Sequence, residues 1–553
     1  MRENCWFQAW RSAKGSREFV SRCLVRRRCL SFNGGRITCP EGLDTAMHYS
    51  TYLCLALATV PCRDADDTPD PRADPADAMR PVLDDLLALV ETFRRAPVCP
   101  TGVAKFENDL QAELRELGRV ITQSAFASLE PAAVTDLPRE VHHGSESYRR
   151  LGKKTPQEVS TLFGKITVHR LGYRAAPQAG EPVLFPLVRE LGIVHGATPA
   201  LVERVARYLA ETGATQGQTL KRLREEHGLA WGVKRLRQVA EFVSAAMERH
   251  RADAQADQVL RWLRLAQQSK GRHRPVLGAG RDGITLGLRL GRFTLYEVAT
   301  TGTISVYDRR GERLGTVYLA YTPEPGQATM TARLTELLTE VLRRWQGPLP
   351  RLCYVTDAGD NETAYYREVL RRMKHPTTGE RLGWTWVLDY YHAALRLTTM
   401  AEALFGASRE ASGWVRKTQK LLLKPGGVGR VLHSAAALRS RRKLGKKARK
   451  DYQRAYDYLR KRRDHARYGE YRRVGMPIGS GVTEAACKTV YTQRLKLSGM
   501  RWKKAGARTI LTLRVILLSG VWSEVYAKTL AVSSRVEVRT PDQSGQFSAR
   551  IAG

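Results

Sequence analysis

The sequence predicts an α/β protein with a mainly helical first half and a sheet-containing second half. Three observations carry this prediction. Apolar residues make up 42% of the 553 residues, which is enough to build packed cores. Their spacing is mostly helical up to Pro275 and changes there to an alternation of two. Beyond that point strand-like and helical runs follow one another, as they do in α/β domains.

The chain is strongly basic, with 91 Lys and Arg against 55 Asp and Glu and a formal net charge of +36. A charge of this size favours a polyanionic partner. No stretch approaches the roughly 18 to 20 uncharged apolar residues that a membrane span requires. We therefore expect DNA or RNA, rather than a membrane, as the partner.

Residues 1–78 have no pattern from which a fold is expected. Seven of the nine cysteines lie in the first hundred residues, without a CxxC pair, and the odd total argues against a disulfide framework. Reduced thiols in a cytoplasm fit this distribution better. The run RDADDTPDPRADPADAM alternates Asp with Pro and Ala, which is typical of a linker. We expect 1–78 to be either unfolded or a misassigned start, together with an Asp/Pro linker.

A mainly helical region is expected over 79–195, beginning with two amphipathic helices and continuing with the short alternations ITVHRLGY and PVLFPLV. The next region, 196–274, is helical and is broken around Gly228 and Gly232 in the manner of a helix-turn-helix. Two interpretations stay open for it, a DNA-reading helix or a helical hairpin with a solvated basic face. The positive charge of this region agrees with both interpretations and comes from Lys221, Arg222, Arg224, Lys234, Arg235 and Arg237.

Residues 275–406 are expected to form three hairpin-linked strands, a helix, a strand, a helix and a last strand that leads into another helix. This is the element order of an RNase H-like core. A basic helical insertion is expected over 407–476, followed by the second part of the core over 477–528 and a flexible tail over 529–553.

The expected insertion is the most basic part of the chain. Between Arg430 and Arg473 there are 17 Lys and Arg against 4 Asp and Glu. A solvated helical face is the usual reason for such a run. Tyrosines interleave with the cations and either stack on distorted DNA or form the helix core: Tyr452, Tyr456, Tyr458, Tyr468 and Tyr471.

The positions of the carboxylates in the expected core indicate which of them are candidate metal ligands, because hard divalent cations need acidic oxygens from several elements. Asp282 is placed at the start of the first strand. Asp357 closes the strand LCYVT, where a side chain leaves the sheet at its carboxyl end. Asp360 and Glu362 fit the cap and first turn of the next helix. Asp308 lies in the turn YDRRGE, and turn chemistry explains it.

A third acid, Glu484, follows the break Gly479-Ser480-Gly481 and occupies the first turn of a helix. It either complements the helix dipole or serves as a metal ligand beside a phosphate backbone. The second interpretation is favoured by the surrounding residues, which we expect to contact DNA: Lys488, Arg494, Lys496, Arg501, Trp502 and Lys503.

The order of Asp282, Asp357 and Glu484, with the motifs LDYYHA, PIGSGVTEAACK, RLKLSGMRW and GARTILTLR, resembles bacterial insertion-sequence transposases of the ISKra type. These are DDE recombinases with an RNase H-like core. Asp389 and His392 match the DxxH signature shared with Mutator-like transposases. The resemblance extends from about Asp282 to Val521.

The resemblance implies that Asp282, Asp357 and Glu484 hold two Mg²⁺ ions, for which Mn²⁺ is a substitute. One ion activates water or a 3′-OH and the other stabilises the leaving oxygen. Transposon ends are cut and the freed 3′-OH attacks target DNA, in a synaptic complex of several copies of the protein. Asp389 and His392 have a second-shell or structural role, and we favour a structural hydrogen bond between them.

One departure and two alternatives accompany this resemblance. ISKra-like proteins often carry a cysteine-rich zinc-binding segment, and here PVCPTG keeps only Cys99. A metal-dependent nuclease without strand transfer would share the three acids. A non-catalytic DNA-binding repressor derived from a transposase is the other alternative, and the presence of all three acids argues against it.

Overall fold

The computed structural model describes residues 31–33, 36–38, 46–49, 52–53, 75–175, 182–531 and 536–539. The chain divides into two compact units. Unit 1 comprises 1–205, 217–239 and 530–553, and unit 2 comprises 206–216 and 240–529. Helices and sheets occur in both units, so the predicted α/β class is confirmed.

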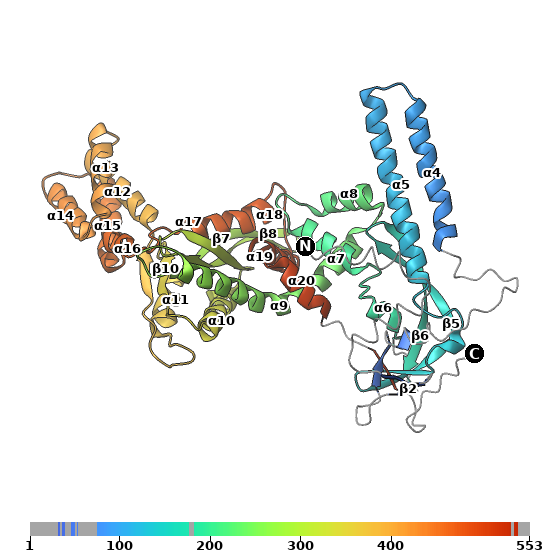
Figure 1. The fold of residues 1–553 in the computed structure, drawn as a ribbon. Coiled ribbons are helices and arrows are strands. Elements are labelled where there is room, and N and C mark those ends of the chain that lie inside the picture. The colour runs from blue at the N-terminus through green and yellow to red at the C-terminus, as the bar shows by residue number, and fades with distance from the viewer. Residues whose placement is uncertain are drawn as a thin grey trace. The chain divides into compact units, whose positions relative to one another are not determined.

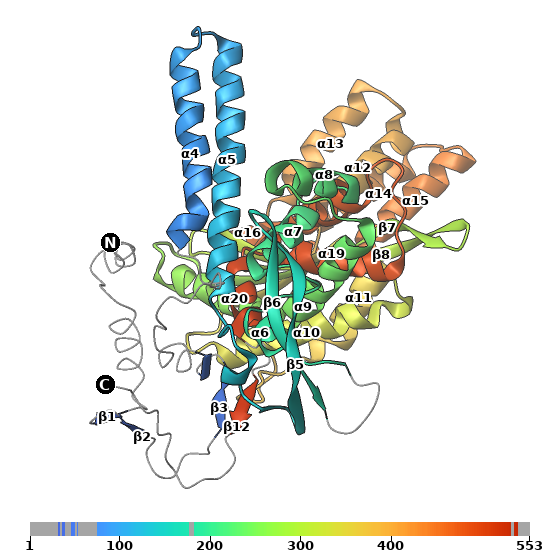
Figure 2. The same cartoon turned by 90° about the vertical axis from the view of Figure 1, so that its right-hand side faces the viewer.

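Unit 1 contains a pair of long helices, α4 (Pro75–Arg95) and α5 (Pro100–Ala127), which lie side by side in Figures 1 and 2. Pro100 suits the first turn of α5, because proline lacks an N–H that this turn would leave unpaired. The rings of Phe93 and Phe106 stack with their centroids 4.3 Å apart and join the two helices near their connection. This pair corresponds to the two amphipathic helices that the sequence predicts.

An antiparallel sheet follows these helices in unit 1. Its strand order is β3-β12-β4-β5-β6, comprising Ala46–His48, Glu537–Arg539, Glu140–His143, Glu146–Thr161 and Gly164–Ala175. The alternation of ITVHRLGY is the pleat of β6, in which Ile166 and Val168 are buried and Thr167 is exposed. The long helices of the region 79–195 therefore end at Ala127, and the prediction that the region is mainly helical is wrong for the strands β4, β5 and β6 that follow.

Segments from both ends of the chain also belong to unit 1. Strand β3 pairs with β12, and the side chains of Tyr49, Leu53, Val536 and Val538 are buried in the core of this unit. The Tyr49 hydroxyl donates a 2.9 Å hydrogen bond to Oε1 of the buried Glu130. The prediction that 1–78 is unfolded is wrong for 46–49 and 52–53.

The predicted flexible tail, 529–553, is likewise ordered in part. Helix α20 (Trp522–Ala531) enters it, and β12 lies within it. Two short strands near the other end, β1 (Ser31–Asn33) and β2 (Arg36–Thr38), pair with each other. The remaining parts of 1–78 and 529–553, including the cysteines before Cys99, lie outside the described residues.

Four helices follow the sheet of unit 1: α6 (Pro186–Glu190), α7 (Pro199–Ala210), α8 (Gln216–His227) and α9 (Val233–Gln268). The predicted break occurs after α8, where Gly228 has a φ of 64°, a left-handed conformation that favours glycine. On α8, Lys221 and Arg222 form ion pairs with Glu225 and Glu226, one turn away. These pairs fit the interpretation of a solvated basic face.

Unit 2 contains a mixed five-stranded sheet with the order β11-β10-β7-β8-β9. Three strands form an antiparallel meander: β7 (Val276–Leu290), β8 (Phe293–Tyr307) and β9 (Arg313–Tyr321). The other two, β10 (Arg351–Thr356) and β11 (Thr385–Leu388), run parallel to β7. The predicted order of elements over 275–406 is therefore present.

Alternation along the strands gives this sheet two chemically different faces. Ile304 and Val306 of β8 are buried in the main core with α10 (Ala328–Arg344) and the second half of α9. The hydroxyls of Thr301 and Thr303 contact the opposite layer, where Thr303 is hydrogen-bonded to Thr483 at 2.8 Å. One face thus packs in an apolar core and the other supports the helix that carries Glu484.

Further helices connect and extend the sheet. Helix α11 (Asp360–Glu368) follows β10, and α12 (Tyr390–Phe405) follows β11. The predicted helical insertion is present as α13 (Arg409–Leu422), α14 (Gly427–Ser440), α15 (Lys446–Lys461) and α16 (Tyr468–Arg473). Tyr452, Tyr468 and Tyr471 are buried in its core, which favours their structural interpretation.

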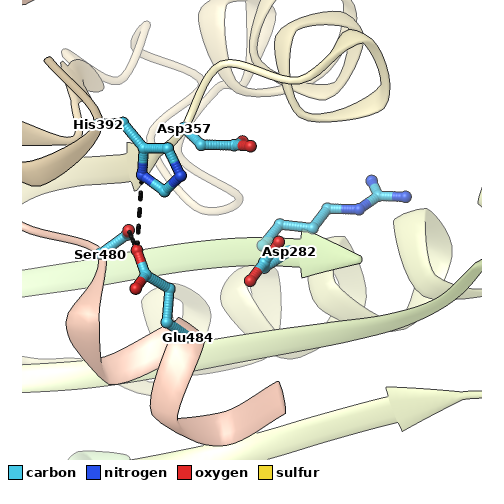
Figure 3. A pocket seen from close by; sticks show the side chains of 6 residues that line it. Asp282, Asp357, His392, Ser480 and Glu484 are labelled. Atoms are coloured by element: carbon cyan, nitrogen blue, oxygen red, sulfur yellow. Dashed lines mark hydrogen bonds and ion pairs between the residues drawn. The ribbon is translucent and has the colours of Figure 1, made fainter. Parts of the chain in front are cut away.

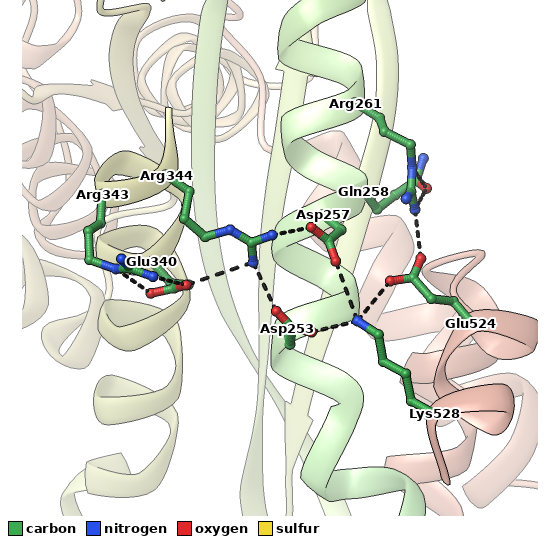
Figure 4. A network of polar contacts seen from close by, with 9 residues as sticks. All are labelled: Asp253, Asp257, Gln258, Arg261, Glu340, Arg343, Arg344, Glu524 and Lys528. Carbon is green, nitrogen blue, oxygen red and sulfur yellow. Dashed lines mark hydrogen bonds and ion pairs between the residues drawn. The ribbon is translucent and has the colours of Figure 1, made fainter. Parts of the chain in front are cut away.

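The last helices of unit 2 are α17 (Gly481–Ala486), a π-helical turn at Cys487–Thr492, α18 (Gln493–Leu495), α19 (Lys504–Leu518) and α20. Figure 4 shows an ion-pair network that joins α9, α10 and α20. In it, Asp253 accepts from Arg344 at 2.9 Å and from Lys528 at 2.5 Å, and Lys528 also pairs with Glu524 at 3.2 Å. These side chains are partly exposed, so each pair contributes little alone.

In the part of the chain that the structure describes, no single helix has both the length and the apolar composition needed to cross a membrane. The helices α19 and α20 meet those criteria only when taken together, and they are bent by 116°.

Candidate functional site

The register of two parallel strands brings the first two predicted acids together. Val355 of β10 is the partner of Gly280 of β7. Asp282 lies two residues further along β7, and Asp357 directly follows the last residue of β10. Asp282 is the seventh residue of β7, so its predicted place at the start of the strand is wrong. The run VLGAG was missed as strand because its glycines and alanine conceal the alternation. Both acids nevertheless lie where the pairing of β7 with β10 ends.

Glycine at position 280 lets the third acid approach the sheet. A Cβ atom on Gly280 would lie 2.1 Å from Thr483 Oγ1 and 2.9 Å from Thr303 Oγ1. Any larger residue would therefore push α17 away from β7 and β8. Because Glu484 follows Thr483 directly, this close approach sets the height of Glu484 above the sheet.

The three predicted acids line one pocket of about 250 Å³, together with Arg281, His392 and Ser480. Figure 3 shows Asp282, Asp357 and Glu484 around this pocket, with the His392 ring between Asp357 and Glu484. We call it the acid pocket. Three regions that are distant in the sequence thus contribute one carboxylate each to the same cavity.

Each acid is held by nearby donors. Asp282 Oδ1 accepts from the Gly283 N–H at 2.7 Å, and Asp357 Oδ1 accepts from the Gly359 N–H at 3.0 Å. The Ser480 hydroxyl lies 2.7 Å from Glu484 Oε1. Among the described residues, no hydrogen bond reaches Asp357 Oδ2 or Glu484 Oε2. These oxygens therefore stay available to a ligand in the pocket.

Asp389 is bonded on both of its oxygens and is fully buried. Oδ1 accepts from the His392 N–H at 2.7 Å and faces His392 Nδ1 at 3.1 Å. Oδ2 accepts from the backbone N–H of Ser480 and from its hydroxyl, the latter at 2.9 Å. Asp389 therefore caps α12, orients the His392 ring and fixes the chain just before Glu484.

Electrostatics in the acid pocket follow from burial and from the proximity of like charges. Burial raises the pKa of Asp282, and the charges of Asp357 and Glu484 raise it further against the hydrogen bonds from Gly283 and Cys487. The hydrogen bond to Asp389 raises the pKa of His392. Burial alone would raise the pKa of Asp389, but its bonds from His392 and Ser480 outweigh this effect and lower it.

Ligand geometry alone selects a different set of residues. Asp389, His392 and Glu484 each offer one ligand atom, and these atoms all lie within 4.8 Å of one another, close enough to hold a metal ion. In the same group, however, both Asp389 oxygens already accept hydrogen bonds, and His392 Nδ1 faces Asp389. Glu484 belongs to this group and also to the predicted set of acids.

The predicted DNA-contacting residues are not all alike. Lys488, Lys496, Arg501 and Lys503 are exposed. Arg494 is fully buried, and its Nε donates to the Leu209 carbonyl at 2.7 Å, so the prediction that it contacts DNA does not fit this structure. The partly buried Trp502 lies near its guanidinium, 5.3 Å from ring centroid to Cζ, and donates from Nε1 to the Leu495 carbonyl at 2.8 Å.

The three acids set aside by sequence lie mostly where they were expected. Asp308 Oδ1 accepts from the backbone N–H groups of Arg310 and Glu312, which is turn chemistry. Asp360 and Glu362 lie in the first turn of α11, but the cap residue is Gly359 rather than Asp360.

Sequence reasoning missed several residues that shape the acid pocket. Glu362 is buried, and burial together with the charge of Asp357 raises its pKa. The hydroxyl of Tyr458, from the helical insertion, donates to the Asp357 carbonyl at 2.6 Å. Ser480 was considered only as a cap. A signal existed for Ser480, which stands between two glycines, but nothing in the sequence predicted that Tyr458 lies beside Asp357.

The sequence matches no protein-family model and no curated protein closely enough to identify a relative. Functional inference for this chain therefore depends on its motifs and its geometry.

Proposed function

We propose that the chain is a DDE transposase of the insertion-sequence type, with an RNase H-like core, that cleaves transposon ends and joins them to target DNA. The observation that carries the proposal is the convergence of Asp282, Asp357 and Glu484 in one pocket, at the end of the β7–β10 pairing. The sheet order β11-β10-β7-β8-β9, with α10 between β9 and β10, supports the assignment of the core.

The residues of the acid pocket fit divalent magnesium. Hard oxygen donors are what Mg²⁺ prefers, and three carboxylates surround the cavity. Burial is the main cause of the raised pKa of Asp282, and the like charges of Asp357 and Glu484 add to it; a bound cation would relieve that repulsion. Asp282, Asp357 and Glu484 would hold the metal, and two Mg²⁺ ions would supply activation of the attacking oxygen and stabilisation of the leaving one.

The chain's own residues position this site and the DNA. The Gly280 approach and the Ser480 bond hold Glu484, while Asp389 keeps His392 beside it. His392 has a raised pKa and can donate to a phosphate oxygen near Glu484. Exposed Lys488, just beyond Glu484, adds positive charge for the DNA backbone. The excess of cations over the whole chain supports a polyanionic substrate.

Three substitutions test the catalytic part of the proposal. Asp282→Asn, Asp357→Asn and Glu484→Gln each remove a negative ligand while nearly preserving shape. Each should abolish Mg²⁺-dependent cleavage and joining of a duplex carrying the inverted repeats that flank the gene, while DNA binding persists. Mn²⁺ should substitute for Mg²⁺ in the parent protein.

Asp308→Asn and Asp360→Asn are the matched controls, because the same chemical change is made in a turn and in the first turn of a helix. They should cost about 1 kcal/mol of stability or less and leave the chemistry intact. Normal cleavage and joining by all three acid variants would reject the two-metal assignment. Cleavage without joining would identify a nuclease, and DNA binding without cleavage by the parent protein would identify a repressor.

A further inference from the structure

Strands β7 and β8 continue well past the rest of their sheet. Pairing of β10 with β7 ends at Gly280, and pairing of β9 with β8 begins at Thr300. Apart from a bridge between Leu288 and Trp502, residues 284–299 therefore pair only across their own hairpin, from Ile284 with Ala299 to Leu290 with Phe293. We call residues 284–299 the ribbon, and Figure 2 shows this hairpin extending past its neighbours.

The end of the ribbon exposes large apolar side chains. Phe293 is 79% exposed, Tyr296 is 72% exposed and Leu290 is 67% exposed. Leu290 and Phe293 are cross-strand partners at the tip, so their side chains leave the same face. Single exposed apolar residues are common, but a cluster at the tip of a projecting hairpin indicates a contact surface.

The ribbon is anchored rather than loose. Leu286 and Leu288 near its base are buried. The Arg289 N–H donates to the Trp502 carbonyl at 2.7 Å, and the indole of Trp502 is itself bonded to the Leu495 carbonyl. The segment that follows the Glu484 helix therefore holds the ribbon in place. Its tip has a fixed relation to the acid pocket, because Asp282 lies on the same strand.

Charge around the tip favours one kind of partner. Arg289 and Arg292 are exposed on the ribbon, and the segment bonded to it adds the exposed Lys496, Arg501 and Lys503. Against these five cations the ribbon has one acid, Glu297. A second copy of a chain with a net charge of +36 would be repelled here, whereas a nucleic acid would be attracted. The apolar side chains can contact stacked bases, and the cations around them can contact the phosphate backbone.

We propose that Phe293 and Leu290 form an apolar wedge that enters DNA bound at the acid pocket and unstacks a base step. This inference rests on the proposed function, because it takes the substrate to be DNA. A two-stranded ribbon fits a DNA groove, and inserted Phe and Leu side chains are known to separate base steps.

The strand geometry sets where the distortion falls. Leu290 follows Asp282 by eight residues of one strand, a span of about 27 Å at the usual rise of a β-strand. At about 3.4 Å per base pair, that span equals roughly eight base pairs. The unstacked step should therefore lie within about eight base pairs of the phosphate that is cut.

The experiment uses the full-length protein and gene-flanking duplexes with 2-aminopurine at successive positions. Unstacking raises 2-aminopurine fluorescence, so the parent should give a several-fold rise confined to a few neighbouring positions. The variant with Phe293→Ala and Leu290→Ala should lose most of this rise, and Phe293→Trp should retain it. Leu265→Ala is the matched control, because Leu265 is 56% exposed on α9 and should leave the signal unchanged. Since Phe293 and Leu290 are exposed, the thermal unfolding midpoint should hardly move.

The outcomes separate this inference from the proposed function. A wedge-dependent rise without any cleavage would support the wedge and overturn the proposed chemistry. Cleavage without a wedge-dependent rise would overturn the wedge alone, and no binding to any duplex would overturn both. Loss of self-association in the Phe293 and Leu290 variant, with the fluorescence signal intact, would show that the tip contacts another copy and would also overturn the wedge.

Discussion

Asp389→Asn is the substitution for which the structure gives the sharpest energetic expectation. The carboxylate is an acceptor only, and it faces four donors, two from His392 and two from Ser480. An asparagine amide has one acceptor oxygen and one donor group. If the oxygen keeps the His392 side, the amide N–H₂ must face the two donors of Ser480.

The size of the loss in unfolding free energy depends on which of the four donors can find another partner. The Ser480 hydroxyl can turn its hydrogen towards Glu484 Oε1, 2.7 Å away, and accept from the new amide. The Ser480 backbone N–H cannot move in this way, and an unpaired buried donor costs about 1 to 3 kcal/mol. The two bonds to His392 lose their charge, which costs about 1 kcal/mol each. We therefore expect a total loss of about 3 to 5 kcal/mol in the free energy of unfolding.

The loss should also depend on pH. Asp389 has a lowered pKa in the folded state, so its contribution is complete above about pH 3.9, the usual value for aspartate, and is lost as the pH falls through the folded pKa. His392 has a raised pKa, so its contribution is complete below about pH 6.5 and is lost as the pH rises through its folded pKa. The difference between parent and variant should therefore be greatest between about pH 4 and 6.5.

Urea unfolding followed by tryptophan fluorescence measures this difference, because Trp384 and Trp386 lie in the same core as β11, which Asp389 directly follows. Asp464→Asn is the matched control, since the Asp464 side chain is 86% exposed and should change stability by no more than about 0.5 kcal/mol. A loss under about 1 kcal/mol for Asp389→Asn would refute the account of four donors on a charged acceptor.

Three other expectations follow. Tyr49→Phe should lower the stability of the protein by about 1 to 3 kcal/mol, because buried Glu130 Oε1 loses its donor, and unchanged thermal unfolding would mean that Tyr49 does not pack there. Lys528→Met should cost about 1 kcal/mol or less and should cost less at high salt, since its partners are partly exposed; a cost of several kcal/mol in urea unfolding would contradict this. His392→Ala should leave Mn²⁺ binding, measured by calorimetry, within a few-fold of the parent, whereas Asp357→Asn should weaken it strongly; the reverse result would place the metal at Asp389, His392 and Glu484.

Two of the three acids in the pocket could be predicted from the sequence because each lies next to a break in the local pattern. Asp357 ends an apolar strand, and Glu484 follows a Gly-Ser-Gly break, so their locations could be predicted from local pattern. Asp282 was recognised although its strand was started too late, since glycines at 278 and 280 interrupt the alternation. Gly280 is needed for packing against α17, and a small residue required by a distant helix looks locally like a break in the strand pattern.

The structure near the two ends of the chain, in contrast, could not be predicted from the sequence. A strand of three residues has no periodicity to detect, and β3 is fixed by pairing Met47 with Val538, almost the whole chain away. Composition suggested a linker and a tail, because local sequence contains no information about a partner at that separation. Only the three-dimensional pairing explains why Tyr49 and Val538 are buried.

The hydrogen bonds of each acid also indicate whether it supports the structure or binds the metal. Asp389 is surrounded by donors from its own helix and from Ser480, so moving either oxygen to a metal would leave buried donors unpaired. Asp357 uses one oxygen to hold its position, and Glu484 Oε1 shares the single Ser480 hydroxyl hydrogen with Asp389 Oδ2. Both Asp357 and Glu484 keep their other oxygen available in the pocket. An acid that is already fully hydrogen-bonded contributes rigidity, whereas an acid with an available oxygen beside like charges gains most from a cation. We therefore expect the metal to bind nearer Asp282 and Asp357 than Asp389, although Asp389 belongs to the group whose ligand atoms all lie within 4.8 Å of one another.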